Sequence, residues 1–256
     1  MKKTYLNICF FIPFVFTIST GPIDSRVYDW KQPVKTSDKK ISTTVLFEGS
    51  AFDMEWLQMN ANALNASKEK IKMTTPQDEE HLYIVKKGAL EILTGDSSNT
   101  LVPGSVAVIM PGKTFFLQNK QNSSCEYYLM KYRSKLPIDT ERGNKAGGSI
   151  IKSWDRVAFK PHDKGGIRNY FERSTAMMKR LEIHVTTLNA GLKSHEPHTH
   201  RAEEIVLMIE GNTEMQIGES FYKGKDGSIF FLGSNISHAI RNEGTKPCTY
   251  FAIQFE

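Results

Sequence analysis

The chain has 256 residues, of which 39% are hydrophobic and 24% are charged. This length can hold one large domain or two small ones, and the composition is that of a globular protein, which excludes a disordered chain. The formal net charge is +5, but lysines and arginines are interspersed with acids and form no basic stripe with aromatic residues between them. We therefore expect no nucleic-acid partner.

The first twenty residues have the layout of a secretory signal peptide. Lys2 and Lys3 precede the apolar run ICFFIPFVFTIS, and small residues follow at Ser19 and Thr20. This run is too short to span a bilayer, although an uncleaved anchor is the alternative. We expect residues 1–20 to be removed, and the mature protein to be periplasmic or secreted without a membrane attachment.

The rest of the chain contains one pattern twice. Residues repeat at an offset of 124 and, after a one-residue slip, at an offset of 123. The pairs include Trp30 with Trp154, Leu57 with Leu181, Gly88 with Gly211, Gly104 with Gly227, Asn119 with Asn242 and Cys125 with Cys248. A long period present twice indicates two copies of one domain. We expect a first domain at 21–135, a Gly-, Pro- and charge-rich linker at 136–150, and a second domain at 151–256.

Each copy has a β pattern. The segment RLEIHVTTL alternates apolar and polar residues, and EEIVLMIEG, GSIFFLG and CTYFAIQF are short apolar runs bounded by Gly, Asn or Pro. No segment of useful length has a helical period. Many short strands separated by turns indicate an all-β fold, with a barrel or sandwich in each half. Whether Cys125 and Cys248 lie close enough for a disulfide stays open.

The stretch SHEPHTHRAEE in the second half holds three histidines and two adjacent glutamates. His198, His200 and Glu204 have the same parity, so on an extended chain they point to one side. Glu203 has the opposite parity and is expected to point away. His238, on a later strand, completes a set of three imidazoles and one carboxylate. Such a set holds Mn, Fe, Ni or Zn while solvent fills the remaining positions.

These spacings resemble the two sequence motifs of the cupin superfamily. The first motif matches at His198, His200, Glu204 and Gly211, with one extra residue after its initial Gly191, and the second matches at Gly227, His238 and Asn242. Gly233 and Asn235 stand where the family usually has Pro and Gly, a departure that concerns a turn and not the ligands. The resemblance implies two tandem jelly-roll barrels, a bicupin, in which the three histidines and the glutamate of the motifs bind one divalent metal ion.

The first half keeps the scaffold residues of the motifs but not the ligands. At an offset of 123, the four ligand positions become Thr75, Gln77, His81 and Phe115. A single imidazole with a hydroxyl, an amide and a phenyl ring is not a metal site. This half therefore resembles the degenerate partner of a bicupin, and we expect metal only in the second half.

A second polar group precedes the proposed ligands. Arg180, Glu182 and His184 share one face of a strand. If that face looks into the barrel, Glu182 or His184 is a candidate catalytic base; if it looks outward, the residues form a solvated face. Arg168 and Arg173 are either clamps for an anion or ordinary surface residues.

Three functions remain open, because the cupin fold hosts many activities. The favoured hypothesis is an exported metal-dependent isomerase, lyase or hydrolase that acts on a small sugar or sugar-acid derivative. The alternatives are a non-catalytic metal- or ligand-binding module and an enzyme resembling ureidoglycine aminohydrolase. The His-His-Glu-His order and the signal peptide depart from that last family. Each hypothesis implies a small-molecule partner, and exposed sheet edges leave a homodimer open.

Overall fold

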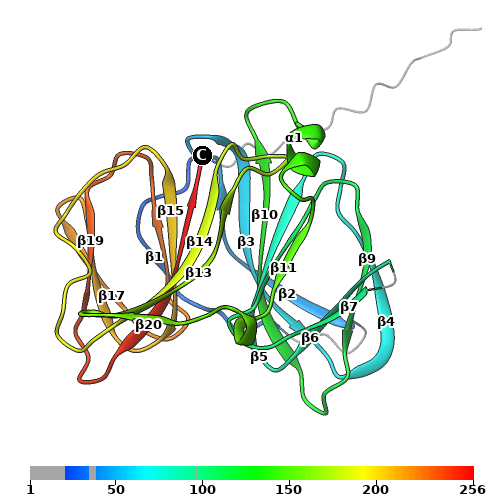
Figure 1. Cartoon of the computed structure of the whole chain (residues 1–256), viewed down its shortest axis with the longest axis horizontal. Helices are drawn as coiled ribbons and strands as arrows, with labels where there is room; N and C mark the ends of the chain where they lie inside the picture. Colours follow the sequence, from blue (N-terminus) through cyan, green and yellow to red (C-terminus); the bar gives the residue numbers. More distant parts are fainter. Residues whose placement is uncertain (1–20, 35–38, 96) are drawn as a thin grey trace, which may run out of the picture.

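The computed structural model describes residues 21–34, 39–95 and 97–256, so the expected signal peptide lies outside it. The described part consists of strands, one short helix, α1 (Thr140–Lys145), and one 3-10 turn, η1 (Trp154–Arg156). Two barrels lie side by side (Figure 1), which confirms the predicted all-β architecture. No helix within the described ranges has the length and apolar character that crossing a membrane requires.

The first barrel is formed by two antiparallel sheets. A six-stranded sheet has the order β11-β8-β5-β10-β3-β2, and a four-stranded sheet has the order β4-β9-β6-β7. The strands are β2 (Ile41–Gly49), β3 (Met54–Leu64), β4 (Ser67–Thr74), β5 (Glu80–Lys87), β6 (Leu90–Thr94), β7 (Ser97–Leu101), β8 (Val106–Ile109), β9 (Thr114–Asn119), β10 (Cys125–Ser134) and β11 (Ile150–Lys152).

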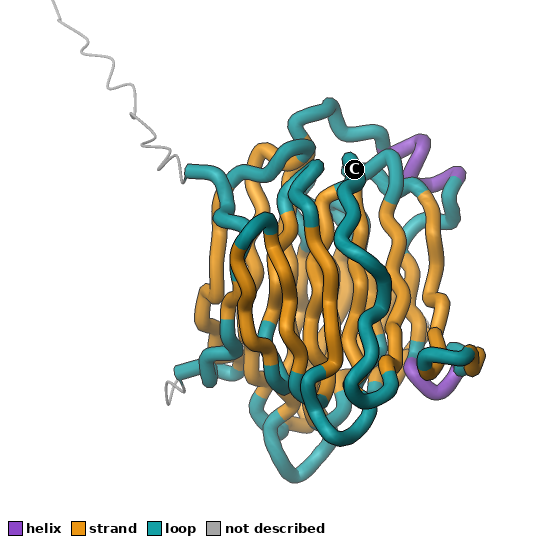
Figure 2. The backbone as a smooth tube through the Cα atoms, turned by 90° about the vertical axis from the view of Figure 1, so that its left-hand side faces the viewer, coloured by secondary structure: helices purple, strands orange, loops and turns teal. Residues whose placement is uncertain are grey.

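The second barrel repeats this plan. Its seven-stranded sheet has the order β1-β18-β15-β20-β14-β13-β12, and its three-stranded sheet has the order β17-β16-β19. The strands are β1 (Val27–Tyr28), β12 (Lys160–His162), β13 (Gly165–Arg173), β14 (Leu181–Leu188), β15 (Glu203–Glu210), β16 (Thr213–Ile217), β17 (Ser220–Gly224), β18 (Ile229–Leu232), β19 (His238–Asn242) and β20 (Cys248–Phe255). Figure 2 shows the strands aligned along nearly one axis, with loops at both ends.

The two large sheets share a core between the barrels, and each barrel has a further core of its own. Successive side chains of a strand point to opposite faces of its sheet. On β14, Leu181, Ile183 and Val185 belong to the core between the barrels. Glu182 and His184 therefore face the interior of the second barrel, which decides the alternative that the sequence left open.

The two barrels exchange their leading strands. Strand β1 comes from the start of the chain but pairs with β18 in the second barrel, whereas β11 follows the linker and pairs with β8 in the first (Figure 1). Strand pairing thus crosses the expected division of the chain at residues 150 and 151. The tryptophan after each exchanged strand contacts a turn glycine of the same barrel: Trp30 lies on Gly227 and Trp154 on Gly104.

We expect Gly104→Ala to destabilise the protein by about 2–4 kcal/mol, because two costs add. Gly104 has a φ of +85°, in the left-handed region, and an added Cβ would lie 2.3 Å from Cε3 of Trp154. Gly218→Ala is the matched control, since Gly218 has a φ of +59° but no heavy atom within 4 Å of an added Cβ. It should cost only about 1–2 kcal/mol. Equal unfolding midpoints in urea for the two variants would show that the tryptophan contact contributes nothing.

The repeat pairs seen in the sequence have matching roles in the barrels. Asn119 donates to the carbonyls of Leu64 and Ser123, and its counterpart Asn242 donates to those of Leu188 and Lys246 at closely similar distances. The equivalent cysteines, Cys125 and Cys248, are both buried and free, one in the core of each barrel. The structure therefore contains no disulfide between them.

Two buried glutamates fix the barrels to each other in a reciprocal way. Glu80 of the first barrel accepts a hydrogen bond from the backbone N–H of Ala176 (3.3 Å), and Glu203 of the second barrel accepts one from that of Phe52 (2.7 Å). Burial raises the pKa of both carboxyl groups. Glu203 thus points toward the first barrel and away from Glu204, as its parity predicts.

Candidate metal centre

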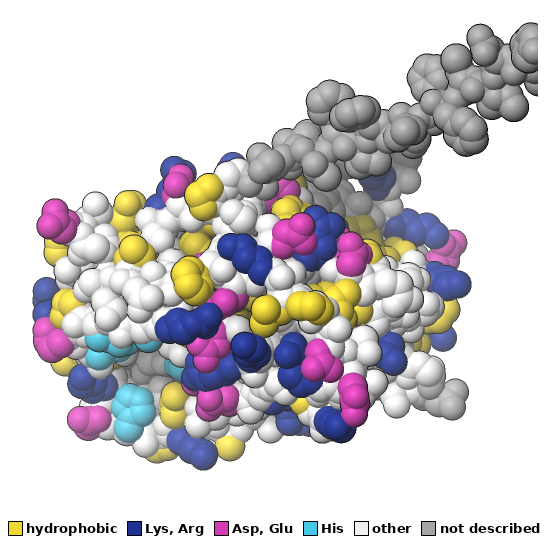
Figure 3. Space-filling view, turned by 90° about the horizontal axis from the view of Figure 1, so that it is seen from above, with side chains coloured by type: hydrophobic (Ala, Val, Ile, Leu, Met, Phe, Trp, Pro, Cys, Tyr) yellow, Lys and Arg dark blue, Asp and Glu magenta, His cyan; other side chains and the backbone are white. Residues whose placement is uncertain are grey.

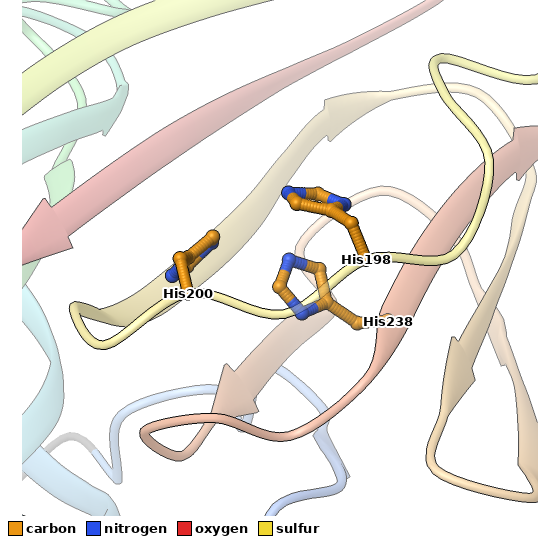
Figure 4. A group of neighbouring side chains, drawn as sticks. All are labelled: His198, His200 and His238. Carbon is orange, nitrogen blue, oxygen red and sulfur yellow. The ribbon is translucent and has the colours of Figure 1, made fainter.

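Three histidine rings gather at one end of the second barrel. His198 and His200 lie on the loop that leads into β15, and His238 begins β19 (Figure 4). One ring nitrogen from each lies within 4.8 Å of the others. Figure 3 shows histidine side chains around a hollow at this end of the barrel.

Glu204, the second residue of β15, adds a carboxylate to the three rings. Its Oε2 lies 3.2 Å from Nε2 of His200 and 3.5 Å from Nε2 of His238. Burial alone would raise the pKa of Glu204, but the hydrogen bond with His200 and the charge interactions with both histidines hold that pKa well below its usual range. The structure thus brings together the four side chains that the spacing singled out, while their binding of a metal stays a prediction.

Two of the rings are oriented by backbone carbonyls close to them in the sequence. Nδ1 of His200 lies 2.8 Å from the carbonyl of Ala202, and Nδ1 of His238 lies 2.8 Å from that of Ile236. Each Nδ1 must therefore carry the proton that it donates, so that in the neutral ring the lone pair is on Nε2.

This tautomer places acceptors against one another. The two Nε2 atoms face the carboxylate oxygen of Glu204, and Nε2 of His238 is buried with no hydrogen-bond partner. Lone pairs so close together repel unless a proton or a cation lies between them. The donor set of three imidazoles and one carboxylate fits a divalent transition metal or zinc.

The surroundings act differently on the individual histidines. Burial, followed by the neighbouring His195, His238 and His200, lowers the pKa of His198. The hydrogen bond to Glu204 is the main cause of the raised pKa of His200. His198 is therefore neutral at physiological pH and available as a ligand without losing a proton.

An unusual turn precedes His238. Asn235 has a φ of 59° and is the one non-glycine residue with a positive φ among those described. Its first-half counterpart, Gly112, has a φ of 68°. The backbone N–H of Asn235 also donates to the carbonyl of His200 at 2.8 Å. Asn235 thus takes the conformation that the family's glycine would supply and ties the two ligand-bearing segments together.

A cavity of about 220 Å³ adjoins the histidine cluster. Its walls include His184 and Thr186 of β14 and Tyr250 of β20, together with His198, Glu204 and His238 of the candidate centre. His195 lies in the loop before β15, packs edge-on against His198 with ring centroids 4.2 Å apart, and also lines the cavity.

The two candidate catalytic residues have different places in this arrangement. His184 lines the cavity, whereas Glu182 lies behind it and accepts a hydrogen bond from Nδ1 of His184 at 2.9 Å. Arg180 forms a salt bridge with the other oxygen of Glu182. Because Nδ1 of His184 donates to a carboxylate, Nε2 is its basic nitrogen.

Both arginines considered as anion clamps are used elsewhere. Arg168 lies over the ring of Trp154, with 4.5 Å between Cζ and the ring centroid, and donates to the carbonyl of Val157. Arg173 donates to the carbonyl of Ala146 at 2.6 Å. Both side chains hold the segments that connect the barrels, and neither lines the cavity.

Gln254 is a wall residue that the sequence did not reveal. Gln254 of β20 lines the cavity and donates from Nε2 to Oε2 of Glu204 at 3.2 Å. The available signal was a single amide in the apolar run CTYFAIQF, with the same parity as Tyr250.

The equivalent end of the first barrel holds different side chains. Nε2 of His81 is paired with Oε2 of Glu79 at 3.0 Å, and the ring of Phe115 packs against that of Tyr83. Thr75 is buried. The scaffold is shared between the barrels, whereas the histidine cluster belongs to the second.

Comparisons with known proteins agree with this geometry. The family described as "Cupin domain" matches residues 184–254, which include all four candidate ligands. No curated protein matches the chain.

Solved structures resemble the whole chain at low sequence identity. AerE from Microcystis aeruginosa is 14% identical with a TM-score of 0.64, over 90% of this chain and 98% of its own. Protein Ylba from E. coli is 13% identical with a TM-score of 0.67, over 91% of each chain. Oxalate decarboxylase from Lactobacillus farciminis, in a formate complex, is 11% identical with a TM-score of 0.64, over 92% of this chain and 87% of its own. Residues 184–254 are therefore a cupin domain, within a chain whose two barrels share the cupin fold.

Proposed function

We propose that the protein is an exported, metal-dependent enzyme that acts on a small sugar or sugar-acid derivative. The observation that carries this proposal is the cavity that His184 shares with His198, Glu204 and His238. A base and a metal-binding donor set that line one cavity can act on the same small molecule. The carbonyl-bound tautomers described above support metal binding by His200 and His238.

The chemistry follows from the residues around the cavity. A divalent cation held by the four donors would polarise a carbonyl or carboxylate oxygen of the substrate. His184 would accept a proton from the substrate at Nε2, because Glu182 holds its Nδ1–H and stabilises the resulting imidazolium. An isomerase, a lyase and a hydrolase would each use this proton transfer.

The walls of the cavity also bear on the charge of the substrate. No lysine or arginine of the described chain is among the residues that line it. A second anionic group on the substrate would therefore have no cationic side chain to neutralise it. This favours a neutral or singly charged molecule, such as a keto sugar or a uronate, over a dianion such as oxalate.

An NMR assay tests the proposal. Protein loaded separately with Mn, Fe, Ni or Zn, then treated with chelator to remove loosely bound ions, is incubated with uronates, keto sugars, ureido compounds and oxalate. Turnover of a sugar derivative that His200→Ala abolishes supports the proposed enzyme. Binding without turnover of any compound favours the binding module. Turnover of a ureido compound alone favours the aminohydrolase.

The export part of the proposal gives a separate prediction. The exported protein should begin near Thr20 or Gly21, where the apolar run ends. Cleavage there keeps the described start of the first barrel, in which Gly21 accepts a hydrogen bond from the N–H of Ser50 at 3.2 Å. N-terminal sequencing of protein from the periplasm or medium measures the site. A membrane-bound product that retains Met1 contradicts cleavage.

A further inference from the structure

A row of polar residues crosses four adjacent strands of the second barrel. Glu172 of β13 pairs with Glu182 of β14, Glu182 pairs with Gln254 of β20, and Gln254 pairs with Glu204 of β15. Directly opposed residues in an antiparallel sheet have neighbouring side chains on one face. The register therefore places Gln254 between the candidate metal ligand and the partner of His184.

Hydrogen bonds fix the orientation of the Gln254 amide at both ends. Its Nε2 donates to Oε2 of Glu204 at 3.2 Å, and its Oε1 accepts from Nη1 of Arg180 at 3.3 Å. A flipped amide would set its oxygen against the carboxylate and its NH₂ against the guanidinium. The charges at the two ends therefore select one orientation.

Arg180 connects this amide to the other half of the row. Its Nε donates to Glu172 at 2.7 Å, and its Nη2 forms a salt bridge with Glu182. A planar guanidinium can serve three partners in fixed directions, which a lysine ammonium on a flexible stem cannot do. An unbroken chain of contacts thus runs from Glu204 through Gln254, Arg180 and Glu182 to His184.

The first barrel has the same register without these residues. Its row is Glu48, Gln58, Lys131 and His81, on strands β2, β3, β10 and β5. Trp56 stands at the position equivalent to Arg180. Gln58 donates to Glu48 and accepts from Asn60, the counterpart of His184. The first barrel, which has His81 in place of the candidate ligand Glu204, therefore also lacks the residues that connect Glu204 to His184 in the second barrel.

We propose that Arg180 and Gln254 are positioning residues that couple the metal-binding carboxylate of Glu204 to the Glu182–His184 pair. This inference rests on the proposed function, because a reaction that uses both the cation and the base needs Glu204 and His184 at a fixed distance and orientation. Gln254 acts by holding the donor oxygen of Glu204. Arg180 acts by holding both Gln254 and Glu182.

Cobalt binding tests the coupling without an activity assay. Co²⁺ affinity and the visible absorption of the Co²⁺ protein are measured for Gln254→Met, Arg180→Met and the double variant. Gln254→Met should weaken binding about 10–100-fold, as loss of an outer partner does, and change the absorption. Arg180→Met should weaken binding by a smaller factor. The double variant should bind Co²⁺ no more weakly than Gln254→Met, because both act through one contact.

A second readout follows the other end of the chain of contacts. In the metal-free protein, Arg180→Met should shift the imidazole NMR resonances of His184, since Glu182 loses its salt bridge. Gln58→Met and Arg201→Met are matched controls: the first removes an amide that donates to a carboxylate in the first barrel, and the second an arginine bound to Asp53 and Glu256 outside the cavity. Both should leave Co²⁺ binding and the His184 resonances unchanged.

The outcomes separate this inference from the proposed function. Additive effects of the two substitutions, or wild-type affinity and absorption in Gln254→Met, overturn the coupling. Gln254→Asn, which keeps the amide on a shorter side chain, replaces Gln254→Met if circular dichroism shows that the latter is unfolded, and the same reduction is expected. A wild-type protein that binds Co²⁺ but turns over no substrate overturns the enzyme alone. Failure of the wild type to bind Co²⁺ overturns both.

Discussion

His238→Ala should reduce the metal content from one ion per chain to none after dialysis against a weak chelator. The Nε2 atom of His238 is buried, has no hydrogen-bond partner and faces the carboxylate of Glu204. Loss of an outer-shell partner weakens metal binding about 10–100-fold, so loss of a direct ligand should weaken it by more than about a hundredfold. Elemental analysis of the purified variants gives the content directly.

His81→Ala is the matched control for this substitution. His81 is equivalent to Glu204 by the repeat, is also buried, and is paired with Glu79 in the first barrel. It should keep one ion per chain. Two ions per chain, or an unchanged content in His238→Ala, would place the metal elsewhere.

Stripping the metal from the wild type should also lower its thermal midpoint, by an amount equivalent to about 2.7 kcal/mol at a metal concentration of 100 times the Kd.

His184→Ala should lower kcat by about 10²–10⁴-fold, the usual contribution of a general base, while the metal content stays at one ion per chain. The two effects are expected to separate because His184 lines the cavity without belonging to the candidate ligand set, and its orientation comes from Glu182, which is not a ligand either. Steady-state kinetics on the substrate found in the NMR assay, with elemental analysis of the same samples, measures both quantities.

His162→Ala is the control for loss of a histidine. His162 ends the exposed strand β12, outside the cavity, and its Nδ1 lies 3.7 Å from the carboxylate of Asp163. It should leave kcat and metal content unchanged. If His184→Ala turns over substrate at the wild-type rate, proton transfer at Nε2 of His184 is excluded, and another cavity residue must act as the base.

The residues of the candidate centre that lie within one short segment could be predicted from the sequence. Parity alone places His198, His200 and Glu204 on one side of an extended chain, and the repeat shows that the first half lacks them. Gln254 could not be found in this way, because its importance comes from the register of β14, β20 and β15. No single segment of sequence specifies which residues of three strands stand opposite one another.

The orientation of β14 is a second feature that could not be predicted from the sequence. Alternation puts Glu182 and His184 on one face, but it does not say which face looks into the barrel. That choice depends on the packing of the two large sheets, which buries Leu181 and Ile183 between the barrels. Similarly, β1 is two residues long, and nothing in so short a segment predicts a partner in the other barrel.

The exchange of leading strands has a consequence for the order in which the protein can assemble. Val27 pairs with Phe230 and Tyr28 with Ile229, so these partners are separated by about 200 residues of chain, which makes their pairing a slow, non-local contact. During synthesis, β1 must wait unpaired until nearly the whole chain has been made. Strand β11, by contrast, meets β8 about forty residues after that strand is made. The first barrel can therefore complete its sheet on the growing chain, whereas the barrel that holds the candidate metal centre becomes complete only at the end.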